Sequence, residues 1–285
     1  MDIRLLRSFV TLAEQGRYHA AADILCVTQP ALTKQIQALE QLTGLSLFQR
    51  GRQGATLTVA GELLYPLAGE LLHQHEEFRN YVDKVKSGSV GRLALGFGIS
   101  SFQLAPSLVR TFRQHFPEVN VSLNDIPSEE QYAMLLSEQL NAGFVRLPAP
   151  APLQTRVLLN EMLVLAVPTT SVSEGMDIQS FLHRYPLLQI SPKRGRGLSD
   201  QTVRFLQANN LHERNVATAD DIHVMLALVA AGNGVALLPS GARHIMPANV
   251  SHFPVSGEHA RWLIGIAWNP LLQNKLRDNF IAMIP

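Results

Sequence analysis

Residues 18–40 read YHAAADILCVTQPALTKQIQALE and decide the fold of the first part of the chain, because they predict two helices joined by a tight turn. Thr28 is a good N-cap for the second helix, since its hydroxyl can accept a hydrogen bond from a free amide of the first turn. Pro30 lies in that turn, where it costs no helical hydrogen bond. The pattern is a helix-turn-helix. Its first helix has a small apolar face that lets another helix cross closely: Ala20, Ala21, Ile24 and Leu25.

The second helix has two different faces. Leu32, Ile36 and Leu39 recur at spacing i, i+4, i+7 and predict a buried stripe. The opposite face carries amide, hydroxyl and ammonium groups, which can bind base edges in the major groove of DNA or phosphates. We expect Gln29 and Thr33 to read bases and Lys34 to hold a phosphate. The candidate DNA-binding residues of this helix are Thr28, Gln29, Pro30, Thr33, Lys34 and Gln37.

Two short extended pieces follow at residues 45–50 and 55–58. They predict a hairpin, or wing, whose tip can lie on the phosphate backbone of DNA. Arg50 and Arg52 are suited to phosphates there and are the remaining DNA-binding candidates. The alternative is that both arginines lie on a solvated turn.

The composition bounds the class of protein. At 285 residues the chain is long enough for about two domains. Hydrophobic residues make up 46% and charged residues 16%, so a sizeable core can form. The net charge is +1, and the first sixty residues hold six Lys and Arg against four Asp and Glu, unlike a generally basic nucleic-acid binder. Binding to double-stranded DNA must therefore rest on a few well-placed contacts and on dimer geometry.

The chain shows neither a charged start followed by an apolar stretch nor an apolar run of about 18 residues. We therefore expect no signal peptide, no membrane partner and a cytoplasmic location. The single Cys26 excludes an internal disulfide and fits a reducing compartment. Its thiol lies in the turn between the two helices. A redox sensor is one interpretation, but we expect a small, buried apolar side chain.

Residues 59–87 predict one long helix with a heptad pattern. No second heptad segment occurs in the chain, so the expected partner is the same helix of another copy, which makes the protein a homo-oligomer. The alternative is that the stripe packs on the head domain of its own chain. The a positions are Leu64, Leu71, Phe78 and Val85, and the d positions are Leu67, Gln74 and Tyr81.

Strand and helix signals alternate after a segment rich in glycine and serine at residues 87–91, which we expect to be a flexible hinge. This alternation predicts an α/β fold with a mostly parallel sheet covered on both faces. Strands are predicted at 92–98, 119–123, 142–145, 163–167, 186–190, 235–238 and 262–267. Helices are predicted at 102–116, 128–140, 200–208, 220–231 and 271–284.

Polar and cationic side chains follow four of the predicted strands, at the place where open α/β sheets bind ligands. Serines open two helices there, and the free amides of a helix start attract an anion. Cations follow two other strands, one group in the loop after residue 190, and arginine binds a carboxylate or phosphate bidentately. These residues predict a small anionic effector, with plain N-caps and a solvated basic loop as the alternatives. They are Ser100, Ser101, Phe102, Ser128, Arg146, Lys193, Arg194 and Arg196.

Several segments of the chain resemble the LysR-type transcriptional regulators. They span nearly its whole length: Ile3–Phe9, Ala20–Leu25, Thr28–Glu40, Gly44–Arg50, Leu57–Gly61, Leu140–Arg146 and Leu228–Pro239. The resemblance implies a mainly-α winged helix-turn-helix domain at 1–58, a linker helix for dimerisation at 59–87 and a two-lobed, periplasmic-binding-protein-like effector domain at 91–285. It implies lobe I at about 91–162 plus 267–285, lobe II at about 163–266, and a homodimer or homotetramer.

The function implied by this resemblance is sequence-specific regulation of transcription under the control of a small metabolite. The alternative is a small-molecule-binding protein or an enzyme on the same two-lobed fold. No Gly-x-Ser-x-Gly, P-loop or His-Glu-x-x-His pattern occurs, so nothing supports catalysis. His73 and Glu77 share a helix face, but no third ligand converges on them, so we expect no metal and no cofactor.

Two positions depart from the family pattern. Arg17-Tyr18 stands where Ser-Phe is commoner, a change that we expect to affect DNA contacts little. Glu138-Gln-Leu-Asn141 replaces Gly-x-Leu-Asp and puts an amide where the family usually has a carboxylate.

Overall fold

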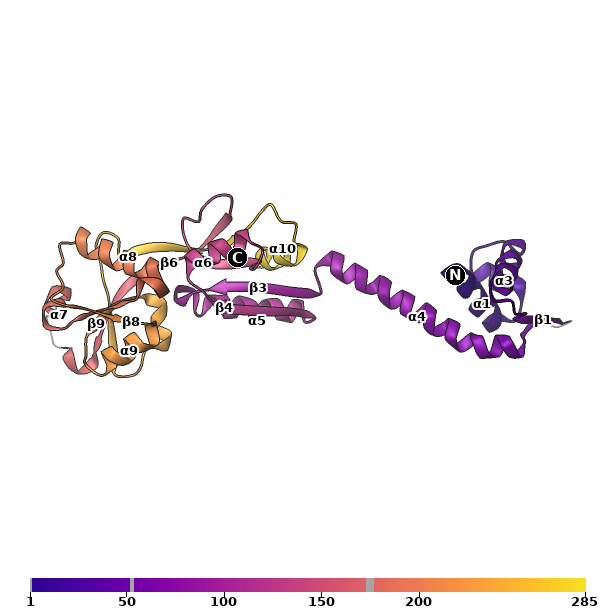
Figure 1. The fold of residues 1–285 in the computed structure, drawn as a ribbon, viewed down its shortest axis with the longest axis horizontal. Helices are drawn as coiled ribbons and strands as arrows, with labels where there is room; N and C mark the ends of the chain where they lie inside the picture. The colour runs from indigo at the N-terminus through magenta and orange to yellow at the C-terminus, as the bar shows by residue number, and fades with distance from the viewer. Residues whose placement is uncertain (1, 52–53, 173–176) are drawn as a thin grey trace. The chain divides into compact units, whose positions relative to one another are not determined.

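The computed structural model describes residues 2–51, 54–172 and 177–285, with the backbone alone at residue 50 and at 193–195. The chain divides into two compact units, Met1–Val85 and Lys86–Pro285 (Figure 1). Among the described residues, no helix combines the length and the apolar character that a membrane span requires.

The first unit is a winged helix-turn-helix followed by a long helix. Its helices are α1 (Ile3–Gln15), α2 (Tyr18–Ile24), α3 (Gln29–Thr43) and α4 (Val59–Ser87). Strands β1 (Phe48–Gly51) and β2 (Gly54–Leu57) pair antiparallel and form the predicted wing.

Both predicted ends of α3 are confirmed. The Thr28 hydroxyl accepts a hydrogen bond from the Ala31 amide at 3.3 Å, and Gly44 ends the helix in the left-handed conformation with φ 70°. The predicted stripe of α3 is buried against α1. The core that these helices share includes Phe9, Leu12, Leu32, Ile36 and Leu39.

Two details of α2 differ from the sequence-based expectation. Ala21 and Ala22 are its buried residues, whereas Ile24 is exposed, so the predicted face was wrong by about one position. Cys26 was expected to be buried and is exposed. It follows a helix of only seven residues and takes φ 51°, a left-handed turn after which Val27 becomes partly buried.

The wing is fixed to α3 by a side chain that the sequence analysis did not single out. One carboxylate oxygen of Glu40 accepts hydrogen bonds from the amides of Leu47 (2.7 Å) and Phe48 (3.2 Å). The second strand is attached to the end of α1, because the Ala55 amide donates to the Gly16 carbonyl at 2.8 Å. The wing therefore has a fixed base, while its tip residue Arg52 lies outside the described residues.

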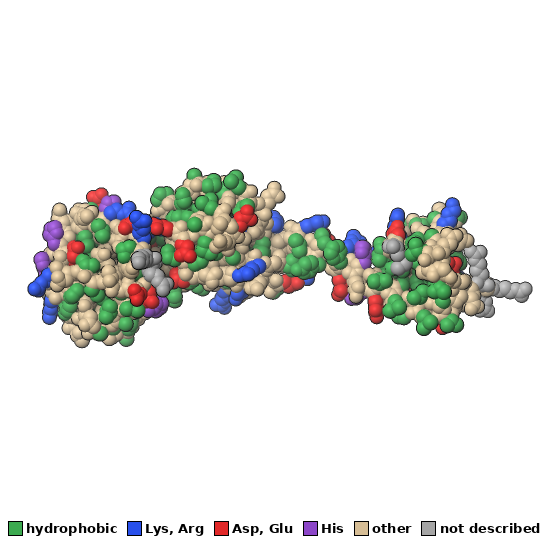
Figure 2. Space-filling view, viewed as in Figure 1, with side chains coloured by type: hydrophobic (Ala, Val, Ile, Leu, Met, Phe, Trp, Pro, Cys, Tyr) green, Lys and Arg blue, Asp and Glu red, His purple; other side chains and the backbone are tan. Residues whose placement is uncertain are grey.

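Helix α4 packs one face on the winged helix-turn-helix of its own chain, residues 3–57, which we call the head. Gly61 and Ala68 are buried there, Leu64 is partly buried, and Arg7 forms an ion pair with Glu76 at 3.0 Å. Leu64, the first a position of the heptad pattern, therefore packs on the head of its own chain, as the alternative to pairing with another copy predicted. The rest of the apolar stripe is exposed: Leu67, Leu71, Phe78, Tyr81 and Val85. Figure 2 shows apolar side chains on the surface of this helix.

The second unit contains one continuous sheet with the strand order β4-β3-β5-β11-β6-β9-β7-β8, and β10 pairs with β6. Two groups of parallel strands flank the antiparallel pair β6 and β11. The predicted strands at 163–167 and 262–267 are present, but the prediction of a mostly parallel sheet missed the first half of β6 and the antiparallel pairing of β6 with β11. The bounds are β3 (Gly91–Phe97), β4 (Val119–Asp125), β5 (Ala142–Arg146), β6 (Gln154–Pro168), β7 (Leu187–Ile190), β8 (Val216–Ala219), β9 (Val235–Pro239), β10 (Val250–Pro254) and β11 (Arg261–Trp268).

Helices cover both faces of each group of strands and create two lobes with separate cores. In lobe I, α5 (Leu104–His115) and α10 (Lys275–Ala282) cover one face of the sheet and α6 (Ser128–Leu136) covers the other. In lobe II, α7 (Ile178–Arg184) and α8 (Pro192–Ala208) lie on one face and α9 (Ile222–Ala230) on the other. Three short 3-10 turns complete the unit: η1 (Ile99–Ser101), η2 (Thr169–Ser171) and η3 (Ser240–Ile245).

Helix α8 corrects the prediction of a basic loop. It begins at Pro192 rather than at residue 200, so Lys193, Arg194 and Arg196 lie in its first turns. Glycines at 195 and 197 disfavour a helix locally, which is why the sequence suggested a loop. The surrounding packing overrides that preference, since Phe205 and Leu206 of α8 are buried in the core of lobe II.

The segment expected to be a flexible hinge contacts α10. Asn279 donates a hydrogen bond through Nδ2 to the Ser87 carbonyl at 2.8 Å. A Cβ atom at Gly88 would lie 2.8 Å from the Leu276 amide nitrogen, and Gly88 has φ 66°. Glycine is therefore needed here for close approach and for a left-handed turn.

The departures from the family pattern at 138 and 141 have clear structural settings. Glu138 takes the left-handed conformation, φ 64°, which a glycine adopts without strain. Asn141 accepts a hydrogen bond through Oδ1 from the Ala94 amide at 2.7 Å. A carboxylate oxygen can accept the same bond, so the amide retains the acceptor and removes the charge.

Replacing Glu138 with glycine should stabilise the protein. A non-glycine residue in the left-handed conformation destabilises the fold by about 1–2 kcal/mol. Glycine removes that strain, but its greater conformational entropy in the unfolded state cancels about 0.5–1 kcal/mol of the gain. We expect Glu138→Gly to raise the free energy of unfolding by about 0.5–1 kcal/mol in urea denaturation. Glu138→Ala removes the same carboxylate without relieving the backbone. If it stabilises as much as glycine, strain is not the cause.

Candidate functional site

The exposed face of α3 carries the predicted DNA-binding side chains. Gln29, Lys34 and Gln37 are exposed, as are Thr28 and Pro30 at the start of the helix. The amide of Gln35, by contrast, faces inward, and its Oε1 accepts a hydrogen bond from the buried Ser8 hydroxyl at 2.6 Å. This bond fixes α3 on α1, a positioning contact that the sequence analysis missed.

Thr33 differs from its neighbours on this face. It is half-buried, and its hydroxyl donates to the Gln29 carbonyl one turn earlier at 3.0 Å. The proton of the hydroxyl is therefore committed within the helix, which leaves its lone pairs and its methyl group for a partner. The side chain of Arg50, on β1, and the whole of Arg52 lie outside the described residues, so their expected phosphate contacts stay predictions.

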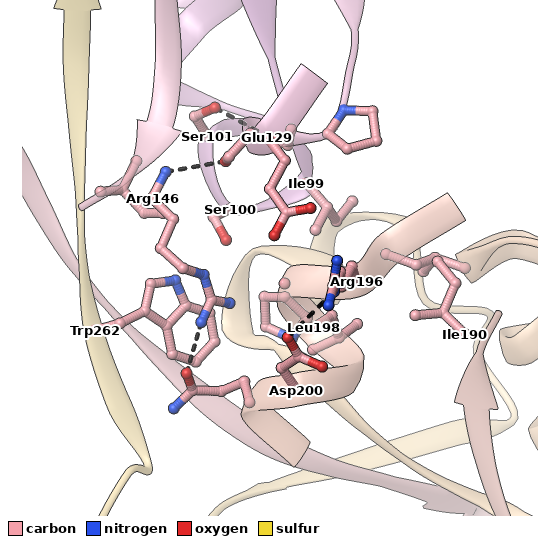
Figure 3. Close-up of a pocket in the computed structure, with 18 of the residues that line it drawn as sticks. Ile99, Ser100, Ser101, Glu129, Arg146, Ile190, Arg196, Leu198, Asp200 and Trp262 are labelled. Carbon is pink, nitrogen blue, oxygen red and sulfur yellow. Dashed lines mark hydrogen bonds and ion pairs between the residues drawn. The ribbon is translucent and has the colours of Figure 1, made fainter. Parts of the chain in front are cut away.

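A cavity of about 810 Å³ lies between the two lobes of the second unit. Its wall is built where parallel strands end, at Gly98 after β3, Arg146 on β5, Ile190 on β7 and Pro239 on β9. This is the place where open α/β sheets hold ligands, because loops and helix starts converge there. Figure 3 shows residues of both lobes around the cavity.

The predicted serines have different roles in this wall. Ser100 points into the cavity (Figure 3). Ser101 is buried, and its hydroxyl donates to the Gly98 carbonyl at 3.0 Å, so its proton is used within the η1 turn. Ser128 accepts a hydrogen bond from the Arg146 amide at 3.0 Å. Phe102 is exposed and does not line the cavity, so the prediction that it contacts a ligand is wrong. The η1 turn directs its side chain outward.

Arg146 is the most constrained cation of the cavity. Its Nη1 donates to Gln201 Oε1 at 2.6 Å, and its Cζ lies 4.2 Å from the centre of the Trp262 ring. The Tyr132 hydroxyl donates to the Arg146 carbonyl. Burial lowers the pKa of Arg146 to about 10, and the charge of Arg204 adds to that effect. The guanidinium is therefore desolvated, oriented and still cationic at neutral pH.

Gln201 connects the anchored arginine to lobe II. It is buried, comes from α8, and donates through Nε2 to the His259 carbonyl in addition to accepting from Arg146. Gln201 and Trp262 were not predicted from the sequence, because no local pattern links either of them to Arg146. Tyr132 was detectable, since it lies one helical turn after Ser128 on the same face of α6.

The predicted cations after residue 190 are only partly described. Arg196 lines the cavity, is exposed, and lies 3.8 Å from Asp200. The side chains of Lys193 and Arg194 lie outside the description. Two arginines that were not predicted, Arg204 and Arg261, also line the cavity.

Carboxylates line the same cavity, and the sequence analysis did not anticipate them. Asp125 ends β4, and burial raises its pKa while the facing His223 acts in the opposite direction. In the part of the chain that the structure describes, no group of three or more potential metal ligands converges. The full set of lining carboxylates is Asp125, Glu129, Glu130, Asp200, Asp220 and Asp221.

Comparison with known proteins gives the same architecture and adds a family. Residues 3–62 match the family model described as "Bacterial regulatory helix-turn-helix protein, lysR family", and residues 86–284 match "LysR substrate binding domain". The chain is 29% identical over 262 residues to the transcriptional regulator BenM of Acinetobacter baylyi, covering 90% of this chain and 86% of BenM. It is 33% identical over 244 residues to ClcR of Pseudomonas putida, covering 84% and 83%.

Two solved structures have the same overall fold as this chain. The crystal structure of CbnR, a LysR family transcriptional regulator, matches with a TM-score of 0.84 at 26% identity and full coverage of both chains. Full-length CbnR in complex with its target DNA matches with a TM-score of 0.82, covering 100% of this chain and 98% of that one.

A winged helix-turn-helix joined to a two-lobed α/β domain defines a DNA-binding regulator of transcription rather than an enzyme. The chain belongs to the LysR family.

Replacing Gln201 tests whether its hydrogen bond anchors Arg146 in the cavity. Gln201→Ala leaves the partly buried Arg146 guanidinium without its acceptor, so the free energy of unfolding of the second unit should fall by about 1–3 kcal/mol in urea denaturation. Gln207→Ala, an exposed glutamine on the same helix, should change it by less than about 0.5 kcal/mol. Equal effects of the two variants would contradict the anchoring role.

Proposed function

We propose that this regulator responds to a small metabolite whose anionic group binds Arg146 in the cavity between the lobes. The observation that carries the proposal is the anchoring of that guanidinium. Only Nη1 has a hydrogen-bond partner among the described residues, so the other nitrogens remain available for a ligand. A partly buried cation without an ion-pair partner is costly, and a carboxylate or phosphate would offset that cost.

The ligand would act by changing the balance between lobe arrangements. The cavity has residues of both lobes in its wall, so a ligand that fits one arrangement better stabilises that arrangement. A differential affinity of a few kcal/mol is enough to shift such an equilibrium. We infer that the shift reaches DNA through the linker helix, within the division of the chain at 1–58, 59–87 and 91–285.

We propose α4 as the element that joins two copies. Beyond the turns that pack on its own head, it exposes a run of large apolar side chains that recur at heptad spacing. Phe78 is 67% exposed and Leu71 is 46% exposed, which is unusual for such residues unless a second copy covers them.

DNA recognition by α3 can be divided into base reading and phosphate contact. Gln29→Ala should weaken binding to a selected cognate sequence by about 1–3 kcal/mol and flatten the preference at one base pair. Lys34→Ala should weaken all sequences alike and reduce the slope of log affinity against log salt by about one. Both are measured by fluorescence anisotropy at several salt concentrations, on a fragment selected from a random library and on a scrambled one.

Gln15→Ala, which removes an exposed amide at the end of α1, serves as the control and should leave both affinities unchanged. Equal weakening of cognate and scrambled DNA by Gln29→Ala would remove Gln29 from the base-reading set.

The dimer proposal predicts that Leu71→Glu yields monomers, because the new carboxylate would be buried without a partner. Tight DNA binding should be lost with it, since a single head forfeits the gain in effective concentration that two linked heads provide. Asn80→Glu places the same charge on α4 outside the apolar stripe and should leave the oligomer intact. Sedimentation velocity distinguishes the two, and an intact oligomer for Leu71→Glu would show that α4 is not the contact.

A further inference from the structure

The cavity of the proposed function does not have the charge balance that a purely anionic ligand requires. Among the described lining residues, six side chains are carboxylates and four are guanidiniums. An anion placed at Arg146 would be attracted there, but the rest of the described wall carries six carboxylates against three guanidiniums. The guanidiniums are Arg146, Arg196, Arg204 and Arg261; the carboxylates are Asp125, Glu129, Glu130, Asp200, Asp220 and Asp221.

Several of these carboxylates are already compensated within the protein. Asp221 accepts the Val224 amide at 2.8 Å as the N-cap of α9, and Asp200 lies 3.8 Å from Arg196. Glu130 lies in the first turn of α6, where the helix dipole favours a negative charge. These groups need no ligand to explain them.

Asp125 and Glu129 are different. Asp125 ends a strand instead of starting a helix, lines the cavity with its side chain exposed, and has no hydrogen-bond or ion-pair partner among the described residues. Partial desolvation raises its pKa, and the charge of His223 lowers it. Glu129 also gains from the start of α6, but its carboxylate points into the cavity, past Ser100 and toward the side where Arg196 lies (Figure 3). Both come from lobe I, on either side of the turn between β4 and α6.

The two charged ends lie along one wall. The Tyr132 hydroxyl donates to the Arg146 carbonyl. Burial raises the pKa of Tyr132, while the charge of Arg146 lowers it and that of Glu129 raises it. Glu129 and Tyr132 lie three residues apart on α6 and share one face of that helix, and Tyr132 contacts Arg146. At the Arg146 end, Trp262 is 8% exposed and its Nε1–H has no acceptor among the described residues, a second sign of an unsatisfied ligand site.

We propose that the effector is zwitterionic, with a carboxylate at Arg146 and a protonated primary amine facing Glu129 and Asp125. This proposal rests on the proposed ligand-responsive function and narrows its ligand class from anions to amino acids and their analogues. Such a ligand satisfies both ends of the wall, whereas a dianion satisfies one end and repels the other.

The test is isothermal titration calorimetry on the full chain with probes that differ only in their end groups. One set has a five-carbon chain: valerate, glutarate, 5-aminovalerate and cadaverine. The other has a benzene ring: 4-methylbenzoate, terephthalate and 4-(aminomethyl)benzoate. In at least one set, the zwitterion should bind about tenfold or more tighter than the matched monoanion and dianion.

Variants identify which end supplies the preference. Glu129→Gln and Asp125→Asn should each reduce the preference for the zwitterion over the dianion by about threefold or more, and Glu129→Lys should reverse it. Glu213→Gln removes an exposed carboxylate outside the cavity and should leave the preference as in the parent.

Three outcomes overturn the proposal: a dianion or monoanion binds most tightly in both sets, the preference survives in Glu129→Gln and Asp125→Asn, or no zwitterion binds at about 20 mM. Arg146→Gln separates this failure from failure of the proposed function. If that variant abolishes binding of the preferred anion, the anionic effector stands and only the amine is wrong. If carboxylates bind Arg146→Gln as they bind the parent, the proposed effector site itself is wrong.

Discussion

The antiparallel pairing of β6 with β11 is the constraint on which the effector domain depends. These two strands pair from Arg261 opposite Met162 to Trp268 opposite Gln154, and they connect the parallel strands of lobe I with those of lobe II. The register shifts between Ile264 and Gly265, where a Cβ atom at Gly265 would lie 2.5 Å from the Arg156 carbonyl oxygen. Residues that follow the ends of parallel strands in both lobes line the same cavity, so the loops and helix starts of the two lobes face each other across it.

A single desolvated arginine then organises the cavity. Arg146 contacts Trp262 of β11 and Gln201 of α8, so its position depends on both lobes. A second buried polar contact lies in the joining strand itself, where Glu161 is 2% exposed and accepts from the Ser240 amide at 3.1 Å. Between the lobes, Gln103 Nε2 lies 2.8 Å from His244 Nδ1. Polar contacts of this kind have directional geometry, which favours discrete lobe arrangements over continuous sliding.

In the head, hydrogen bonds from side chains fix the recognition helix α3 and the wing. The surface of the head carries few charges, so the orientation of α3 is set by short-range contacts at both ends of the motif. Ser8 binds Gln35 between α1 and α3, and Glu40 binds the amides at the start of the wing. A fixed recognition helix and a fixed wing base suit a protein whose specificity must come from placed contacts rather than from a strong field.

The sequence by itself determined the features that depend on neighbours along the chain. The helix-turn-helix with its caps at Thr28 and Gly44, the wing, the length of α4 and the alternation of strands and helices follow from local periodicity and from capping chemistry. The sequence also selected Ser100, Ser128 and Arg146 as wall residues, because each stands at the end of a strand. Only the tertiary structure decided that α8 starts at Pro192, that Cys26 is exposed, that Phe102 faces outward, and that Gln201, Trp262 and Glu129 meet Arg146 in one cavity. Those residues come from separate elements of two lobes, and their proximity is fixed by the pairing of β6 with β11, a contact between segments about a hundred residues apart that no local pattern encodes.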